Sequence, residues 1–131
     1  ERLSALPWNM PHHIYGFTKQ MPEFMAASSM LVTKAGPGTI SEGFSAGLPL
    51  VLYSRLPGQE DGNVQYVVKK QAGVWAPRPH QVVDAVRRWV TDPAALKAAA
   101  AASTRVAKPD AARQIARIIA DRAGVYAPLK R

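Results

Sequence analysis

Two short apolar runs that flank a glycine-rich turn constrain the fold of this chain more than any other feature. Met30 to Val32 form the first run, Gly36-Pro37-Gly38 the turn, and Leu50 to Leu52 the second run, with Gly47 closing a short helix between them. Strands that are apolar on both sides are typical of parallel sheets with helices on both faces. The sequence therefore predicts an α/β fold in which these two strands lie in one parallel sheet.

The length and composition limit the class of protein. The 131 residues suffice for one domain with a core, but they are few for a complete two-substrate enzyme. Apolar runs stay well below the ~18 to 20 residues of a membrane-spanning helix, and the N-terminus lacks the pattern of a signal peptide. The absence of cysteine excludes a disulfide framework and a thiolate metal site. We therefore expect a protein that faces the cytosol.

The positive charge is concentrated in the last third of the chain. Ten Lys and Arg stand against three Asp between Arg87 and Arg131, within a net charge of +8 for the whole chain. A nucleic acid or an anionic membrane surface could pair with such a segment. The basic residues are not interleaved with aromatic side chains, and this disfavours nucleic acid. Solvated helix faces are the simple alternative.

Periodicity and capping residues predict the remaining elements. Adjacent His12 and His13 would point to opposite faces of a strand, so they cannot chelate one metal ion as a pair, and we expect ordinary edge residues. The stretch Ala94 to Ala107 has few large anchors and predicts a surface helix. The other expected elements are a strand over 12–16, an edge strand at Val74-Trp75, and helices over 22–27, 63–71 and 81–90, of which the helix over 63–71 is closed by Ala72-Gly73. A last helix should run from the cap Asp110 to Ala123, with Gly124 at its end. Its side chains Ile115, Ile118 and Ile119 should face inward.

The segment KAGPGT, from Lys34 to Thr39, joins a strand end to a helix start. Free N–H groups and the helix dipole at such a place favour an anion such as a diphosphate, and small residues let it approach the backbone. The loop PGQEDGN, from Pro57 to Asn63, follows the next strand and should lie on the same rim of the sheet. The pattern matches neither the Walker loop nor GxGxxG, and a plain tight turn is the alternative.

Thr39 and Glu42 allow two interpretations. The spacing Thr-x-x-Glu fits a capping box, in which each side chain accepts a hydrogen bond from the backbone N–H of the other residue. A carboxylate one helical turn from a phosphate-binding loop is also well spaced to hold the ribose of a nucleotide. The residues alone leave both interpretations open.

Several motifs taken together resemble those of a known family. They are GF at 16–17, TKAGPGTISE at 33–42, GLP at 47–49, and PGQEDGN at 57–63 followed by YVV at 66–68. From about Ile14 to Val106 the chain resembles the C-terminal half of monogalactosyldiacylglycerol synthases and related diacylglycerol glucosyltransferases. These belong with the bacterial peptidoglycan N-acetylglucosaminyltransferase among inverting enzymes built from two Rossmann-like domains, the GT-B fold. The resemblance implies that residues 1–131 form the C-terminal nucleotide-sugar domain, with a Rossmann-like parallel sheet and flanking helices, and that an N-terminal acceptor domain lies outside this chain.

The resemblance also implies roles for individual residues in binding the donor UDP-sugar. A neutral amide beside a carboxylate suits a sugar, because the pair can donate to and accept from neighbouring hydroxyls. By position in the motifs, Gly16, Phe17 and Thr18 would border the uracil, and Glu42 would hold the ribose. The diphosphate would be held by Lys34, Gly36, Pro37, Gly38 and Thr39. The donor sugar would be held by Gln59 and Glu60, and Asn63 would make a further contact with the sugar or cap a helix.

The activity implied by the resemblance is hexosyl transfer from UDP-galactose or UDP-glucose to a diacylglycerol-type lipid, without a cofactor or metal ion. The loop amides would stabilise the leaving UDP. No residue here is a convincing base for the acceptor hydroxyl, so the base is expected in the N-terminal domain.

A lipid acceptor implies a peripheral position on the cytoplasmic side of a membrane, either a bacterial plasma membrane or a plastid envelope. The face that carries Arg113 and Arg117 is the expected contact with anionic headgroups. Two other classes of function stay open. They are a non-catalytic module that binds nucleotide sugars or phosphate and, less favoured, a basic nucleic-acid-binding domain.

Overall fold

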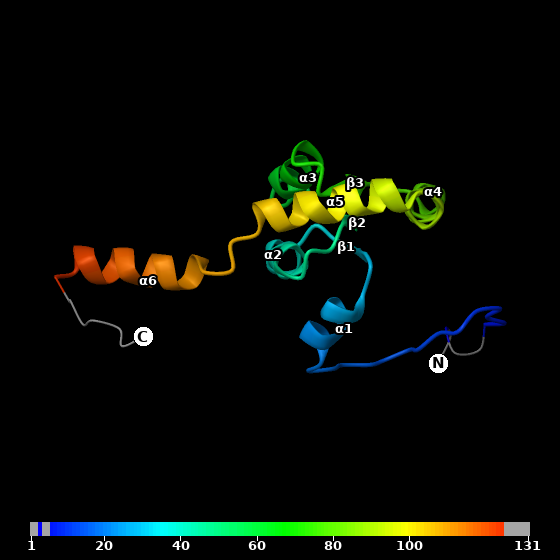
Figure 1. The fold of residues 1–131 in the computed structure, drawn as a ribbon, viewed down its shortest axis with the longest axis horizontal. Helices are drawn as coiled ribbons and strands as arrows, with labels where there is room; N and C mark the ends of the chain where they lie inside the picture. Colours follow the sequence, from blue (N-terminus) through cyan, green and yellow to red (C-terminus); the bar gives the residue numbers. More distant parts are fainter. Residues whose placement is uncertain (1–2, 4–5, 125–131) are drawn as a thin grey trace.

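Three parallel strands form the centre of the molecule (Figure 1). The structure is a computed structural model, and it describes residue 3 and residues 6–124. The strands β1 (Leu31–Lys34), β2 (Leu50–Ser54) and β3 (Gly73–Trp75) lie in the order β1-β2-β3, and both neighbouring pairs are parallel. The predicted α/β fold with a Rossmann-like parallel sheet and flanking helices is confirmed.

Helices precede, separate and follow the strands. Pro37 gives α2 a suitable φ at its first residue, and Asp92 accepts a hydrogen bond from the N–H of Ala95 at 3.0 Å where α5 begins. The expected helices are confirmed to within about two residues at each end. Their bounds are α1 (Met21–Ala27), α2 (Pro37–Ser45), α3 (Asp61–Lys69), α4 (Pro79–Thr91), α5 (Pro93–Val106) and α6 (Ala111–Arg122).

Strand β2 lies between two apolar clusters. Leu50 and Leu52 pack into one cluster with Phe44 of α2 and other side chains of α2 and α3. Val51 packs into the other cluster with Trp89 of α4 and part of α5. All three strand residues are fully buried. Successive side chains of a strand point to opposite faces, so an unbroken apolar run is needed where helices cover both faces.

Helix α5 was expected on the surface, and most of its residues are exposed or half-buried, but one side of it packs more closely than its few large anchors suggested. Ala99 and Ala102 are buried, and Ser103 is fully buried with its Oγ donating to the carbonyl oxygen of Leu48 at 2.8 Å. Small side chains let the helix approach α2 and α4 closely, so it needs few large anchors to be packed.

The end of α3 also differs from the expectation. Gln71, with φ of 58°, takes the left-handed conformation after the helix, so closure by Ala72-Gly73 is wrong. Gly73 instead begins β3, where a Cβ would clash with the carbonyl oxygen of Leu50 on the neighbouring strand. The glycine is therefore required by the close approach of two strands.

Two segments lie away from the sheet in Figure 1, the chain before α1 and the helix α6. The strand expected over 12–16 is wrong, because these residues find no strand partner in the described chain. Ile115, Ile118 and Ile119 are 56%, 56% and 62% exposed, so the expectation that they face inward is wrong as well. Their hydrophobic stripe lies on a helix that leaves the body of the molecule.

The ends of α6 agree with the expectation only in part. Asp110 precedes the helix but makes no capping hydrogen bond with its side chain, whereas Gly124 follows it with φ of 67°, as expected for a helix end. Lys130 and Arg131, which belong to the basic third, lie outside the described residues. In the described part of the chain, each helix is too short or too polar to cross a membrane.

Replacing Gly73 by alanine should destabilise the fold. The new Cβ would clash with the Leu50 carbonyl oxygen and lie 2.8 Å from Cγ1 of Val67. We expect the free energy of unfolding to fall by about 1 to 3 kcal/mol, measured by urea unfolding with circular dichroism. Gly62→Ala is the control, because a Cβ there meets nothing within 4 Å and the residue is helical, so stability should stay level or rise. A Gly73→Ala protein as stable as wild type would contradict this packing.

Candidate functional site

The loop between β1 and α2 contains the free backbone N–H groups at the start of α2; Gly36 is buried, whereas Gly38 is exposed. Gly36 is the residue before α2, and its carbonyl oxygen accepts a hydrogen bond from the N–H of Ile40 at 3.0 Å. In the described chain, no hydrogen bond has the N–H of Gly36, Gly38 or Thr39 as its donor. Pro37 has no N–H. Unpaired donors and the positive end of the helix dipole coincide here, at the carboxyl end of β1.

The capping box considered for Thr39 and Glu42 is absent. Helix α2 begins at Pro37, so Thr39 lies inside its first turn and cannot act as the cap. The carboxylate of Glu42 is therefore not held by the backbone of Thr39. It is exposed, and it lines a hollow of about 470 Å³ between α1 and α2 that Met21 and Met25 also line.

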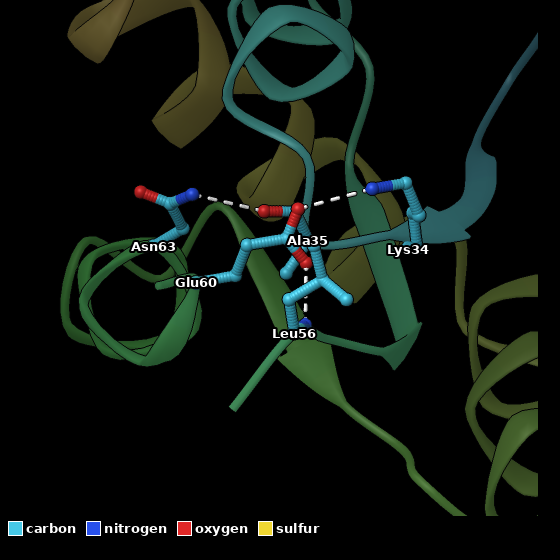
Figure 2. A network of polar contacts seen from close by, with 5 residues as sticks. All are labelled: Lys34, Ala35, Leu56, Glu60 and Asn63. Carbon is cyan, nitrogen blue, oxygen red and sulfur yellow. Dashed lines mark hydrogen bonds and ion pairs between the residues drawn. The ribbon is translucent and has the colours of Figure 1, made fainter. Parts of the chain in front are cut away.

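A buried carboxylate connects this loop to the next one along the rim. Glu60 is 5% exposed; its Oε1 accepts from Nζ of Lys34 at 3.0 Å, and its Oε2 accepts from the N–H of Leu56 at 2.7 Å (Figure 2). The N–H of Leu56, and next to it the ammonium of Lys34, lower the pKa of Glu60 below its ordinary value of 4.5, although burial opposes them. Glu60 is therefore held as an anion that accepts from both loops.

Ala35 is held by hydrogen bonds through both of its backbone polar groups. Its N–H donates to the carbonyl oxygen of Ser54 at 2.7 Å, and its carbonyl oxygen accepts from Nδ2 of Asn63 at 2.9 Å. Figure 2 shows Asn63 approaching from the side opposite to Lys34. The turn after β1 is thus held by the side chain of Asn63 from α3 and by the backbone of Ser54 at the end of β2.

The PGQEDGN loop has contacts of its own. Gly58 has φ of 80°, a conformation that favours glycine, and its N–H donates to Oδ2 of Asp61 at 2.9 Å. Asp61 also forms an ion pair with Arg55. The loop therefore has a defined conformation that presents the exposed side chain of Gln59 near the rim.

The structure brings most of the predicted site residues to one rim. Lys34, Gly36, Pro37, Gly38 and Thr39 lie on one short segment, and Glu60 and Asn63 contact that segment directly. The side chain of Lys34 is 55% exposed even though it is paired. Glu42 lies on the same helix, one turn further along. The roles assigned to these residues stay predictions.

Gly16, Phe17 and Thr18 do not join this group. They lie just before α1, where the chain bends at Gly16 and Phe17, and Phe17 is 97% exposed; the chain before α1 runs away from the sheet in Figure 1. The hydroxyl of Thr18 accepts from the N–H of Gln20 at 3.0 Å. Their place beside a uracil stays a prediction.

Sequence reasoning missed two parts of the site. It gave no role to Met21 and Met25, which line the hollow beside Glu42; their position on an apolar helix side just before the first strand is the signal that was available. It also missed the mutual pairing of Lys34 and Glu60. Lys34 ends β1 and Glu60 lies in the loop after the neighbouring parallel strand β2, and these two opposite charges could have indicated that pair.

Comparison with known proteins identifies relatives over most of the chain. The model of the glycosyltransferase family 28 C-terminal domain matches residues 3–115. Monogalactosyldiacylglycerol synthase 2, chloroplastic, of Arabidopsis thaliana is 37% identical over 128 residues, which cover 97% of this chain and 27% of that protein. Probable monogalactosyldiacylglycerol synthase 3, chloroplastic, of Oryza sativa subsp. japonica is 42% identical over 118 residues, covering 89% of this chain and 23% of that protein.

A third relative has higher identity over a shorter stretch. Probable monogalactosyldiacylglycerol synthase 2, chloroplastic, of Oryza sativa subsp. indica is 48% identical over 89 residues, covering 68% of this chain and 19% of that protein. The chain thus spans about a fifth to a quarter of the length of these relatives. The resemblance drawn from the sequence motifs is confirmed.

Stability should depend on the charge of Glu60 in acid. The pKa of Glu60 is lower in the folded than in the unfolded chain. The charged carboxylate therefore adds to the free energy of unfolding in full above pH 4.5, and this addition is lost as the pH falls through the folded-state pKa. Glu60→Gln should therefore be less stable than wild type at pH 7, with a gap that narrows below pH 4.5. Urea unfolding of both proteins from pH 7 to pH 3 measures this difference in the free energy of unfolding. Glu23→Gln, which replaces an exposed carboxylate, is the control. A gap that stays constant with pH would contradict the charged interaction.

Proposed function

The chain belongs to the glycosyltransferase family 28 C-terminal domains, and from this membership we propose that it binds the UDP-sugar donor of an inverting glycosyltransferase. The enzyme would transfer a hexose to a diacylglycerol-type lipid. The names of the relatives specify a monogalactosyl product, which favours UDP-galactose over UDP-glucose here. The observation that carries the proposal is the open loop from Lys34 to Thr39, with unpaired N–H groups at a helix start.

The diphosphate would bind at this loop. Gly38 has nothing within 4 Å of the place where a Cβ would stand, so a phosphate could approach the backbone there. Lys34, whose side chain is 55% exposed and whose ammonium pairs with Glu60, would bring a charged donor next to the amides. The loop offers hydrogen-bond donors and positive potential where an anion would lie, which supports a diphosphate as the ligand.

The nucleoside and the sugar would lie on either side of the diphosphate. Glu42, free of any cap, has an exposed carboxylate that could accept hydrogen bonds from both ribose hydroxyls. The apolar hollow beside it, lined by Met21 and Pro22, could hold a flat base, with Gly16 to Thr18 moving to its edge. Gln59 is exposed and could bind the hexose, whereas buried Glu60 would reach it only by weakening its present bonds.

The contribution of these residues to the reaction would be stabilisation of the leaving UDP. Charge develops on the diphosphate as the glycosidic bond to it breaks, and oriented amides, the helix dipole and Lys34 would oppose that charge. The base that deprotonates the acceptor hydroxyl is expected from an N-terminal acceptor domain of the same enzyme. The present chain would hold the donor half of the active site.

The acceptor determines where the enzyme would work. A diacylglycerol stays in its bilayer, so the enzyme would sit peripherally at a membrane surface, and the chloroplastic relatives favour the plastid envelope over a bacterial plasma membrane. The face with Arg113 and Arg117 remains a proposed contact with anionic headgroups. The exposed isoleucines, which lie on the other side of α6, were expected to be buried and are not part of that contact.

Glu42→Gln should weaken binding of uridine diphosphate. Loss of charge-assisted hydrogen bonds to the ribose should cost about 1.5 to 3 kcal/mol of binding free energy, measured by titration calorimetry. Because Glu42 caps nothing, the melting temperature should not change. Glu23→Gln removes an exposed carboxylate from α1 and is the control. Unchanged affinity in Glu42→Gln would mean that the ribose is bound elsewhere.

A further inference from the structure

The geometry points to Asn63 as a positioning residue for the diphosphate loop, acting through the backbone of Ala35 and not through the sugar. This inference rests on the proposed function and adds to it a specific role for Asn63. Its central observation is the hydrogen bond from Nδ2 of Asn63 to the carbonyl oxygen of Ala35, 2.9 Å long (Figure 2). The two residues are 28 positions apart in the sequence, so α3 reaches across the rim to hold the end of β1.

The Ala35 carbonyl decides where the next N–H points. In a planar trans peptide the C=O and the following N–H point in opposite directions, and the described chain has no cis peptide bond. Asn63 fixes the Ala35 oxygen toward α3, so the N–H of Gly36 must point away from α3. That N–H is one of the unpaired donors of the loop.

The loop needs such a restraint because little else holds this peptide. Gly36 has no side chain, and the residue after it is Pro37, whose missing N–H removes a possible backbone bond. The N–H of Ala35 is tied to Ser54 at 2.7 Å, but that bond lies on the other side of the Ala35 Cα. Without Asn63, the peptide between Ala35 and Gly36 could rotate about its flanking bonds and turn its N–H away from an anion. Glycine on one side makes this rotation easy.

Asn63 is poorly placed for the direct sugar contact that its motif suggests. It stands in the first turn of α3 and is partly buried, and one N–H of its amide is already used by Ala35. In Figure 2 Glu60 enters from the same side as Asn63 and meets Lys34, which comes from the other side. Glu60 thus holds the side chain of Lys34, and Asn63 is the residue that acts on the backbone carbonyl of Ala35.

Binding of three ligands to Asn63→Leu separates this role from the others. Leucine has nearly the shape of asparagine but cannot donate a hydrogen bond. Calorimetry with uridine, uridine diphosphate and UDP-galactose should give wild-type affinity for uridine and a loss of about five- to tenfold for both diphosphates. Gln65→Leu removes an exposed amide from the same helix and should bind all three ligands as wild type does. Circular dichroism and melting temperature report whether each variant folds.

Each outcome decides between the explanations. Equal loss for uridine diphosphate and UDP-galactose, with uridine unchanged, supports positioning of the diphosphate loop. A loss for UDP-galactose alone would overturn the inference in favour of a sugar contact, and unchanged affinity for all three would overturn it outright. If Asn63→Leu does not fold, Asn63→Ser, which is too short to reach Ala35, replaces it with the same expected pattern. Failure of wild type to bind any of the three would instead refute the proposed function.

Discussion

Burial of β2 on both faces is the constraint on which the rest of the structure depends. Leu50, Val51 and Leu52 are fully buried between two sets of helices, and β2 pairs in parallel with a strand on each side. Parallel pairing brings the carboxyl ends of adjacent strands to one edge of the sheet. The loops after β1 and β2 are therefore neighbours, although more than twenty residues separate them. The polar site could not form without that arrangement.

The two loops are joined by polar contacts that use buried or half-buried groups. Glu60 accepts hydrogen bonds from Lys34 and from the backbone of Leu56, and Asn63 donates to Ala35. A buried carboxylate without partners would be costly, so these contacts make the conformation of each loop depend on the other. The result is a glycine-containing turn that is held in place by both loops while several of its amides stay without a hydrogen-bond partner in the described chain. Such preorganisation is what stabilisation of a developing negative charge requires.

The sequence predicted the elements better than it predicted their surroundings. The apolar runs, Pro37 and the Asp92-Pro93 pair have local causes, and the strands and helices follow them. The close packing of one side of α5 was not predicted, because it depends on how closely alanines let two helices approach, which no periodicity reveals. The exposed stripe on α6 was missed for the opposite reason: its pattern is that of a packed helix, yet it extends from the body of the molecule (Figure 1). The site residues could be gathered from motifs, whereas the pairing of Lys34 with Glu60 was only hinted at by opposite charges near neighbouring strands, and its geometry needed the structure.

In the proposed function, the amides of the β1–α2 loop bind the diphosphate of a nucleotide sugar. Titration of the ¹⁵N-labelled chain with uridine diphosphate, followed by amide chemical shifts, tests this binding site. We expect the largest shifts at the N–H groups of Gly36, Gly38 and Thr39, all saturating at the same ligand concentration, while the amide shifts of α5 stay unchanged. Saturable binding whose largest shifts fall on α5 or α6, with the loop amides unmoved, would contradict it.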